Sequence, residues 1–323
     1  MSNIGKVSEF ISICLQLTLE SSKIISQIQK SGSLGEQWKG KNDPMTIADL
    51  KSQALIIKGI RQFFPQIKIV AEEQIDYTGD LNYDFQKLNK KLIPEQYFLK
   101  NNLNNQLNIS DAVVYIDPLD GTLSYVNGEL DSVCTLIGVT INGLPTIGIV
   151  GQHYDDNNQY NPKIYFAHSQ VNQVFYAYGS ELNEEGRQFY LPYEFQKPIY
   201  NSNLDNLVAT ISQNRISQQQ LDTIQALKPV QIIRKGGFGK KGLMVLEKQA
   251  DYLVYLSKGA SRWDICALEA IISAAGGFIT DINANNYQYD ENMEDFHNQN
   301  GGLMSMKKEV LDYISGQLSD YKI

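Results

Sequence analysis

The chain has 323 residues, of which 42% are hydrophobic and 20% charged, and its formal net charge is -8. This length and apolar content suffice for one large domain or two modest ones, whereas the acidic balance argues against a protein that binds a nucleic-acid polymer through a basic face. The three cysteines are far apart and form no CxxC pair, so the sequence supports neither a disulfide framework nor a zinc knuckle, and we expect a reducing, cytoplasmic compartment.

The N-terminal half predicts two helices and a series of strands. Apolar residues at close to helical spacing predict an amphipathic helix over residues 7–28, whose charged and polar residues argue against a signal peptide. A second helix is predicted from about Thr46 to Phe64, where Pro65 ends it. The turn at residues 142–143, Asn-Gly, predicts a β-hairpin. Strands are predicted over residues 67–71, 112–116, 133–140, 145–151, 164–167, 174–178 and 207–211.

The polar stretches divide this pattern. Residues 76–110 predict a surface excursion with some helix, and residues 180–206 separate the two halves of the chain. We expect an α/β (α+β) fold with an N-terminal part over 1–190 and a C-terminal part over 191–323. No run of about 18 apolar residues predicts a membrane span, so no membrane partner is expected. In the second half, helices are predicted near 217–227, 239–249 and 264–275, and strands at 230–234, 251–256 and 278–280.

The DPLDGT segment at residues 117–122 carries two carboxylates three positions apart, directly after a predicted buried strand. Proline and glycine favour a tight turn there, and such a turn can direct Asp117, Asp120 and the Leu119 carbonyl toward one point. Hard cations such as Mg²⁺ prefer oxygen ligands of this kind. The alternative is a structural turn in which Asp120 only accepts hydrogen bonds from backbone amides.

Three more carboxylates occupy positions where chemistry is common. Glu72 follows the predicted strand over 67–71, and active sites of α/β sheets gather at such strand ends. Asp264 stands at the start of one predicted helix and Asp49 in the first turn of another, so helix capping is an alternative for both. Capping explains each residue singly but leaves their joint occurrence with the DPLDGT segment unexplained.

These segments resemble, in identity and order, the motifs of the inositol monophosphatase superfamily. The resemblance spans about residues 5 to 315 and implies a layered αβαβα sugar-phosphatase fold and a lithium-sensitive, Mg²⁺-dependent phosphomonoesterase activity. Within the superfamily, the bisphosphate nucleotidases are most similar, through the run over 113–154, the long polar insertion before it and the GGFGKK segment. The motifs that carry the resemblance are TIAD at 46–49, AEE at 71–73, DPLDGT at 117–122, WD at 263–264 and AGG at 275–277.

The resemblance also implies a metal-ligand set. One metal would be held by Glu72, Asp117 and the Leu119 carbonyl, and a second by Asp117, Asp120 and Asp264. Left empty, these carboxylates would repel one another. Bound cations offset that repulsion, and they also explain how an acidic protein accepts an anionic substrate.

The resemblance gives the attacking water to Asp49 and Thr122. Asp49 would face Thr122 and lie near a further metal, so two or three Mg²⁺ ions are expected. Where the nucleotidases usually carry a Ser-His-Ser-like segment, residues 210–215 here read TISQNR, without a histidine. Lys241 and Arg262 are candidate contacts for a second phosphate, the alternative being that each is a solvated surface charge. The candidate substrate contacts are Gly121, Thr122, Ser212, Asn214, Lys241 and Arg262.

The resemblance therefore predicts hydrolysis of the 3′-phosphate of adenosine 3′,5′-bisphosphate to AMP and phosphate. The alternative enzyme is an inositol polyphosphate 1-phosphatase acting on an inositol bisphosphate. An alternative of another class is a catalytically idle sensor that binds metal or nucleotide, although such a protein would typically have lost a metal carboxylate or the threonine. We expect a monomer or a homodimer with a small-molecule substrate.

Overall fold

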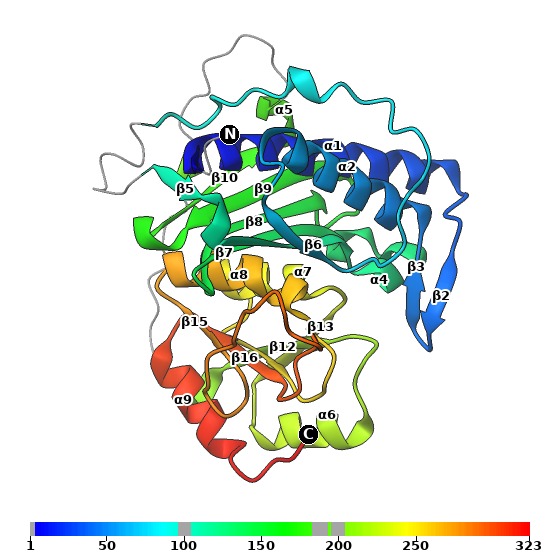
Figure 1. Cartoon of the computed structure of the whole chain (residues 1–323). Helices are drawn as coiled ribbons and strands as arrows, with labels where there is room; N and C mark the ends of the chain where they lie inside the picture. Colours follow the sequence, from blue (N-terminus) through cyan, green and yellow to red (C-terminus); the bar gives the residue numbers. More distant parts are fainter. Residues whose placement is uncertain (1–3, 96–104, 183–192, 195–203) are drawn as a thin grey trace.

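The structure is a computed structural model that describes residues 4–95, 105–182, 193–194 and 204–323. Its helices and sheets stack in the αβαβα order that the family resemblance implies (Figure 1). The layers are, from top to bottom of Figure 1, α1 (Val7–Ser31) with α2 (Ile47–Phe63), a seven-stranded sheet, α7 (Phe238–Leu246) with α8 (Arg262–Ala274), a five-stranded sheet, and α6 (Gln218–Ala226) with α9 (Lys308–Gln317).

Helices α1 and α2 confirm the first two predicted helices, and both have well-defined ends. Helix α1 ends at Gly32, whose φ of 68° lies in the left-handed region that glycine adopts without strain. Helix α2 begins at a capping box in which the Thr46 side chain accepts from the Ala48 amide and the Asp49 side chain accepts from the Thr46 amide. This box fixes the Asp49 side chain at the start of the helix.

The seven-stranded sheet has the order β11-β10-β9-β8-β7-β6-β4. Strand β4 (Lys68–Ala71) runs parallel to β6, and the other neighbours are antiparallel. The predicted hairpin is confirmed, with Asn142 and Gly143 at φ 52° and 75° between β7 and β8. The other strands are β6 (Ala112–Asp120), β7 (Cys134–Ile141), β8 (Leu144–Tyr154), β9 (Tyr160–His168), β10 (Gln173–Tyr178) and β11 (Tyr193–Glu194).

Helix α8 lies with α7 in the layer between the two sheets and packs closely on β7 and β8. Gly138 and Gly148 make this approach possible, because a Cβ at Gly148 would overlap the Ala267 carbonyl and a Cβ at Gly138 would lie 2.5 Å from the Ala267 nitrogen. The helix thereby brings Asp264, in its first turn, toward the end of β6. Helix α8 belongs to the second half of the chain but packs on the sheet of the first half, so the two halves share this layer. The predicted division into two parts at 190/191 therefore stays a prediction.

The five-stranded sheet has the order β13-β12-β14-β16-β15, and α6 and α9 flank it (Figure 1). Strand β12 is parallel to β13 and β14, whereas β16 is antiparallel to β14 and β15. Its strands are β12 (Val208–Ser212), β13 (Gln231–Lys235), β14 (Tyr252–Tyr255), β15 (Phe278–Thr280) and β16 (Gly302–Ser305).

Several short elements were not predicted, because two to four residues give too little periodicity to detect. They include the hairpin of β2 (Gln37–Gly40) and β3 (Asp43–Met45), and the pair β1 (Ile4–Lys6) and β5 (Gln106–Asn108). In the excursion over 76–110, the described helical structure is a 3-10 turn at Phe85–Lys87 and one at Ile109–Asp111, while residues 96–104 lie outside the described part. Among the described residues, no helix is both long and apolar enough to cross a membrane.

Candidate metal centre and active site

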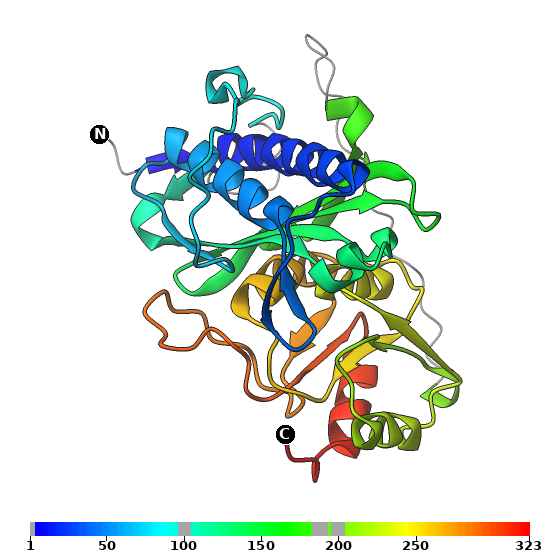
Figure 2. The same cartoon turned by 90° about the vertical axis from the view of Figure 1, so that its right-hand side faces the viewer.

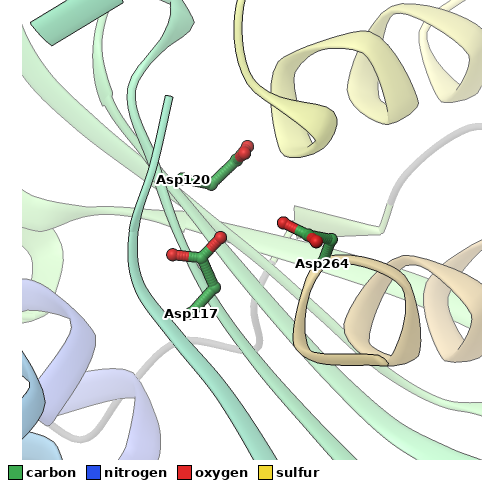
Figure 3. Close-up of side chains that lie close together, drawn as sticks. All are labelled: Asp117, Asp120 and Asp264. Atoms are coloured by element: carbon green, nitrogen blue, oxygen red, sulfur yellow. The ribbon is translucent and has the colours of Figure 1, made fainter. Parts of the chain in front are cut away.

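Three aspartates from two elements meet at one place. Asp117 and Asp120 lie at the end of β6, and Asp264 lies in the first turn of α8. Each offers a carboxylate oxygen, and these oxygens all lie within 4.8 Å of one another. Figure 3 shows the three side chains around a common space between the sheet and the helices. The structure thus brings together three of the predicted metal ligands, which are 147 positions apart at most (264 − 117).

Backbone amides hold each of these carboxylates in place. In a regular strand Asp117 and Asp120 would point to opposite faces, but the register of β6 against β7 shifts between them, and both side chains line the same pocket. Asp117 Oδ1 accepts from the Leu119 amide at 3.1 Å, and Asp264 Oδ2 accepts from the Ser261 amide at 2.5 Å in a capping box. The capping alternative for Asp264 is therefore correct as far as it goes, and it orients the carboxylate without excluding metal binding.

Asp120 is held by the beginning of helix α7. Its Oδ1 accepts from the Phe238 amide at 2.7 Å and its Oδ2 from the Gly239 amide at 2.6 Å. Gly237 precedes them with φ 62°, and a Cβ there would lie 2.5 Å from the Ser132 carbonyl and 2.8 Å from Asp120 Oδ2. The GGFGKK segment therefore has a positioning role that sequence analysis did not assign, because the partners are 118 residues apart.

The electrostatics of the cluster favour a bound cation. Burial, and then the charges of Glu72, Asp120 and Asp264, raise the pKa of Asp117 well above its usual range. Burial and then Asp120 raise the pKa of Asp264 to about 7, and burial raises that of Asp120 against the opposing effect of Lys241. Buried carboxylates with this mutual repulsion are stabilised as anions by a divalent cation, and an all-oxygen donor set fits Mg²⁺.

Glu72 lies beside the cluster but not within its tightest group. It follows β4, lines the same pocket as Asp117, and contributes to the raised pKa of that residue. Its Oε1 accepts from Lys39 Nζ at 3.1 Å, and the same ammonium donates to Glu73 at 2.9 Å. Lys39 thus supplies positive charge to Glu72 in this structure, and the role of Glu72 as a metal ligand stays a prediction.

Asp49 and Thr122 face each other, as the resemblance implies. Thr122 Oγ1 lies 3.0 Å from Asp49 Oδ1 and 2.9 Å from the Leu119 carbonyl, so one hydroxyl proton has two acceptors. Asp49 Oδ2 accepts from the amide and the hydroxyl of Thr46, at 2.8 and 2.6 Å. Asp49 is fully buried, and burial raises its pKa to about 7 against these hydrogen bonds. Since Asp49 does not line the pocket, metal binding by it stays a prediction.

Gly121 makes the turn into the short helix α4 (Thr122–Val126) possible. Its φ is 89°, and a Cβ would lie 2.8 Å from the Ser132 carbonyl. Gly121 and Thr122 both line the pocket next to Asp120. The predicted phosphate contacts of these two residues therefore lie beside the cluster of aspartates.

The pocket extends from the carboxylates to the second half of the chain. Ser212, Asn214 and the buried Lys241, three of the candidate substrate contacts, line it, and their contact with a substrate stays a prediction. Lys241 Nζ donates to the Gly237 carbonyl, next to the amides that hold Asp120, and burial lowers the pKa of Lys241 to about 8 against the charges of Asp120 and Asp264. Pocket residues that sequence analysis missed include Asp43, Pro44, Arg215, Tyr255, Ser257 and Lys258.

Comparison with known proteins places this geometry in a family. Residues 6–320 match the family described as Inositol monophosphatase family. The chain belongs to the inositol monophosphatase family. Its similarity to 3′(2′),5′-bisphosphate nucleotidase 1 of Dictyostelium discoideum is 34% identity over 95% of this chain and 95% of that protein, and to the protein of that name from Mus musculus 28% over 90% and 88%.

Solved structures of inositol monophosphatase family members share the fold. An IMPase of Thermotoga maritima superimposes with a TM-score of 0.63 at 19% identity, covering 96% of this chain and 97% of that chain. The family member CysQ of Bacteroides thetaiotaomicron superimposes with a TM-score of 0.61 at 19% identity, covering 92% and 97%. At this identity the likeness supports the layered fold alone.

Arg262 is the predicted contact that the structure of this family member does not bring to the site. Its side chain is buried, does not line the pocket, and donates from Nε to the Gln288 carbonyl at 2.6 Å. Its guanidinium lies 5.3 Å from the Tyr287 ring centroid and 5.7 Å from that of Tyr289. The prediction that Arg262 contacts substrate is corrected, because the loop after β15 covers this residue. The alternative of a solvated surface charge is wrong for both Arg262 and Lys241, since both are buried.

Glu269, which lies against one of these tyrosines, predicts a pH-dependent stability of the fold. Tyr289 donates to Glu269 Oε2 at 2.6 Å, yet burial raises the pKa of Glu269 to about 7. Because the folded pKa exceeds the ordinary value of 4.5, the stabilisation is complete below about pH 4.5 and is lost as the pH rises through 7. Glu269→Gln should therefore be roughly 1–3 kcal/mol more stable than the wild type at pH 8. Chemical denaturation at pH 5 and pH 8 measures the free energy of unfolding of both proteins. A difference between Glu269→Gln and the wild type that does not grow with pH would contradict the prediction.

Proposed function

We propose that this chain is a Mg²⁺-dependent phosphomonoesterase that removes the 3′-phosphate of adenosine 3′,5′-bisphosphate, giving AMP and phosphate. The observation that carries the proposal is the cluster of the buried Asp117 and Asp120 with the partly buried Asp264 at the pocket, beside the Asp49–Thr122 pair. Full-length similarity to bisphosphate nucleotidases supports the substrate class. Cytoplasmic location, lithium sensitivity and two or three ions belong to the same proposal.

The chain's own groups would share the reaction as follows. Asp117, Asp120 and Asp264 would hold Mg²⁺, with Glu72 and the Leu119 carbonyl as further ligands. When bound, Mg²⁺ supplies charge that neutralises phosphate oxygens and lowers the pKa of water. Thr122, with its hydroxyl between Asp49 and the Leu119 carbonyl, would orient the water that attacks phosphorus in line with the leaving 3′-oxygen.

The substrate side would use the rest of the pocket. The amides of Gly121 and Thr122 would hold oxygens of the phosphate that is transferred, and Lys241 would add a positive charge beside them. Ser212 and Asn214 would contact the nucleoside. Asn214 would take the place of the histidine that this segment lacks and lines the pocket, whereas its neighbour Gln213 donates to Glu129 Oε1 at 2.8 Å and does not line it.

A direct comparison of three substrates tests the proposal. We expect kcat/KM for adenosine 3′,5′-bisphosphate to exceed that for inositol 1,4-bisphosphate and inositol 1-phosphate by roughly 10-fold or more, because binding energy from remote groups assists catalysis at the metal centre. Phosphate release in Mg²⁺ is the measurement, with AMP as a matched poor substrate. Equal or faster turnover of inositol 1,4-bisphosphate would favour the inositol polyphosphate 1-phosphatase. Absence of turnover with all of them would favour the sensor.

A further inference from the structure

An ion pair between distant parts of the chain borders the pocket. Arg215 follows β12, and its Nη2 donates to Asp43 Oδ1 at 2.8 Å and to the Asn42 carbonyl at 3.2 Å. Asp43 begins β3, in the hairpin that descends from the upper helix layer in Figure 2. Asp43 and Arg215 both line the pocket. A carboxylate of the first half of the chain thus holds a pocket arginine of the second half.

The charges along the pocket are divided. Three of the carboxylates that line it, Asp117, Asp120 and Asp264, form the candidate metal cluster with Glu72 beside them, and Lys241 is buried near them. Arg215 and Lys258 also line the pocket, but they are exposed. A ligand that spans the pocket therefore meets a metal centre and, in addition, exposed cations, which suits a molecule with two separate phosphates.

The ion pair between Arg215 and Asp43 is weak enough for a phosphate to replace the carboxylate. The Arg215 side chain is 58% exposed and that of Asp43 43%, and ion pairs this exposed contribute little to stability. A phosphate offers three oxygens and up to two negative charges. The planar guanidinium can bind two of these oxygens at once, and such a bidentate contact is stronger than a single contact to a carboxylate. The Arg215 amide donates to Ser212 Oγ at 3.2 Å, which anchors the backbone while the side chain can change partner.

We propose that Arg215, assisted by Lys258, binds the second phosphate of the substrate, and that Asp43 holds Arg215 in position until this phosphate replaces it. The inference rests on the proposed function and names the specificity residue of that site. Arg215 takes the role of second-phosphate contact that sequence analysis had suggested for Arg262. For adenosine 3′,5′-bisphosphate the second phosphate is the 5′ one. Asp43 competes with it, so the two partners of one ion pair have opposite effects on substrate binding.

Steady-state kinetics with adenosine 3′,5′-bisphosphate and adenosine 3′-monophosphate test this, since the second substrate lacks the 5′-phosphate. Arg215→Gln should raise KM for the bisphosphate about 10-fold with little change in kcat, the size expected for one charge-assisted contact, and leave KM for the monophosphate unchanged. Asp43→Asn should lower KM for the bisphosphate roughly 2–3-fold, as for an exposed ion pair. Arg234→Gln, at an exposed position of β13 outside the pocket, is the matched control.

The outcomes separate this inference from the function beneath it. An equal rise of KM for both nucleotides in Arg215→Gln, or a rise of KM for the bisphosphate in Asp43→Asn, would overturn the phosphate subsite while leaving the phosphomonoesterase intact. A wild-type protein that hydrolyses neither nucleotide would overturn the proposed function, and the subsite with it. Circular dichroism of each variant checks that the loss of an exposed pair has not altered the fold.

Discussion

Asp117→Asn is expected to reduce phosphate release from adenosine 3′,5′-bisphosphate by about 10³-fold or more, since loss of groups that merely support metal ligands already costs 10–100-fold. Asp117 is close enough to Glu72, Asp120 and Asp264 for the charge of each to raise its pKa. A ligand shared by two proposed metal sites weakens both when it is neutralised. Initial rates across a Mg²⁺ titration measure the loss, and excess Mg²⁺ should not restore it.

The same variant has a readout that does not depend on activity. Removing one negative charge from a buried, mutually repelling cluster should raise the melting temperature of the metal-free protein, while the stabilisation that Mg²⁺ gives the wild type should shrink. Asp222→Asn, at an exposed position of α6, is the matched control and should change neither quantity. Wild-type turnover in Asp117→Asn, or an unchanged Mg²⁺-induced shift in melting temperature, would contradict the metal centre.

The extent to which the sequence predicts this site follows from the range of each interaction. The DPLDGT segment after a buried strand locates Asp117 and Asp120 because turn chemistry and strand pattern are local properties. The approach of Asp264 depends on α8 packing against β7 and β8, which only the recurrence of family motifs indicated. The amides that hold Asp120 are 118 and 119 residues away along the chain, and no local pattern in GGFGKK predicts that contact.

Arg262 and Arg215 show what the sequence does not predict about the site, namely the direction of their side chains. Both are arginines near segments that carry the family resemblance, and charge alone does not distinguish them. The direction of Arg262 is set by Tyr287, Tyr289 and the Gln288 carbonyl in a long loop without periodic pattern. Arg215 is held at the pocket by contacts with the hairpin of β2 and β3, whose strands are four and three residues long, respectively. Side-chain direction therefore had to come from the tertiary structure.

Thr122→Ala separates orientation of the water from metal binding. Its kcat should fall about 10²-fold or more, the usual contribution of a positioned proton-transfer partner, while Mg²⁺ affinity stays within about 3-fold, because the hydroxyl bonds to Asp49 and to the Leu119 carbonyl and the aspartate cluster is untouched. The interaction is realised mostly in the transition state, so KM should change little. Single-turnover rates and Mg²⁺ calorimetry measure the two quantities.

Thr122→Ser is the matched variant, since it keeps the hydroxyl and loses only a methyl group, and it should retain most of the rate. The alanine variant leaves the buried Asp49 Oδ1 without this hydrogen bond, at a cost of about 1–3 kcal/mol. Rates must therefore be compared well below the melting temperature of both variants, so that lost fold is not counted as lost catalysis. If Thr122→Ala instead loses Mg²⁺ affinity while turnover at saturating Mg²⁺ is unchanged, Thr122 supports the Leu119 carbonyl as a structural residue, and the attacking water must be oriented by another group.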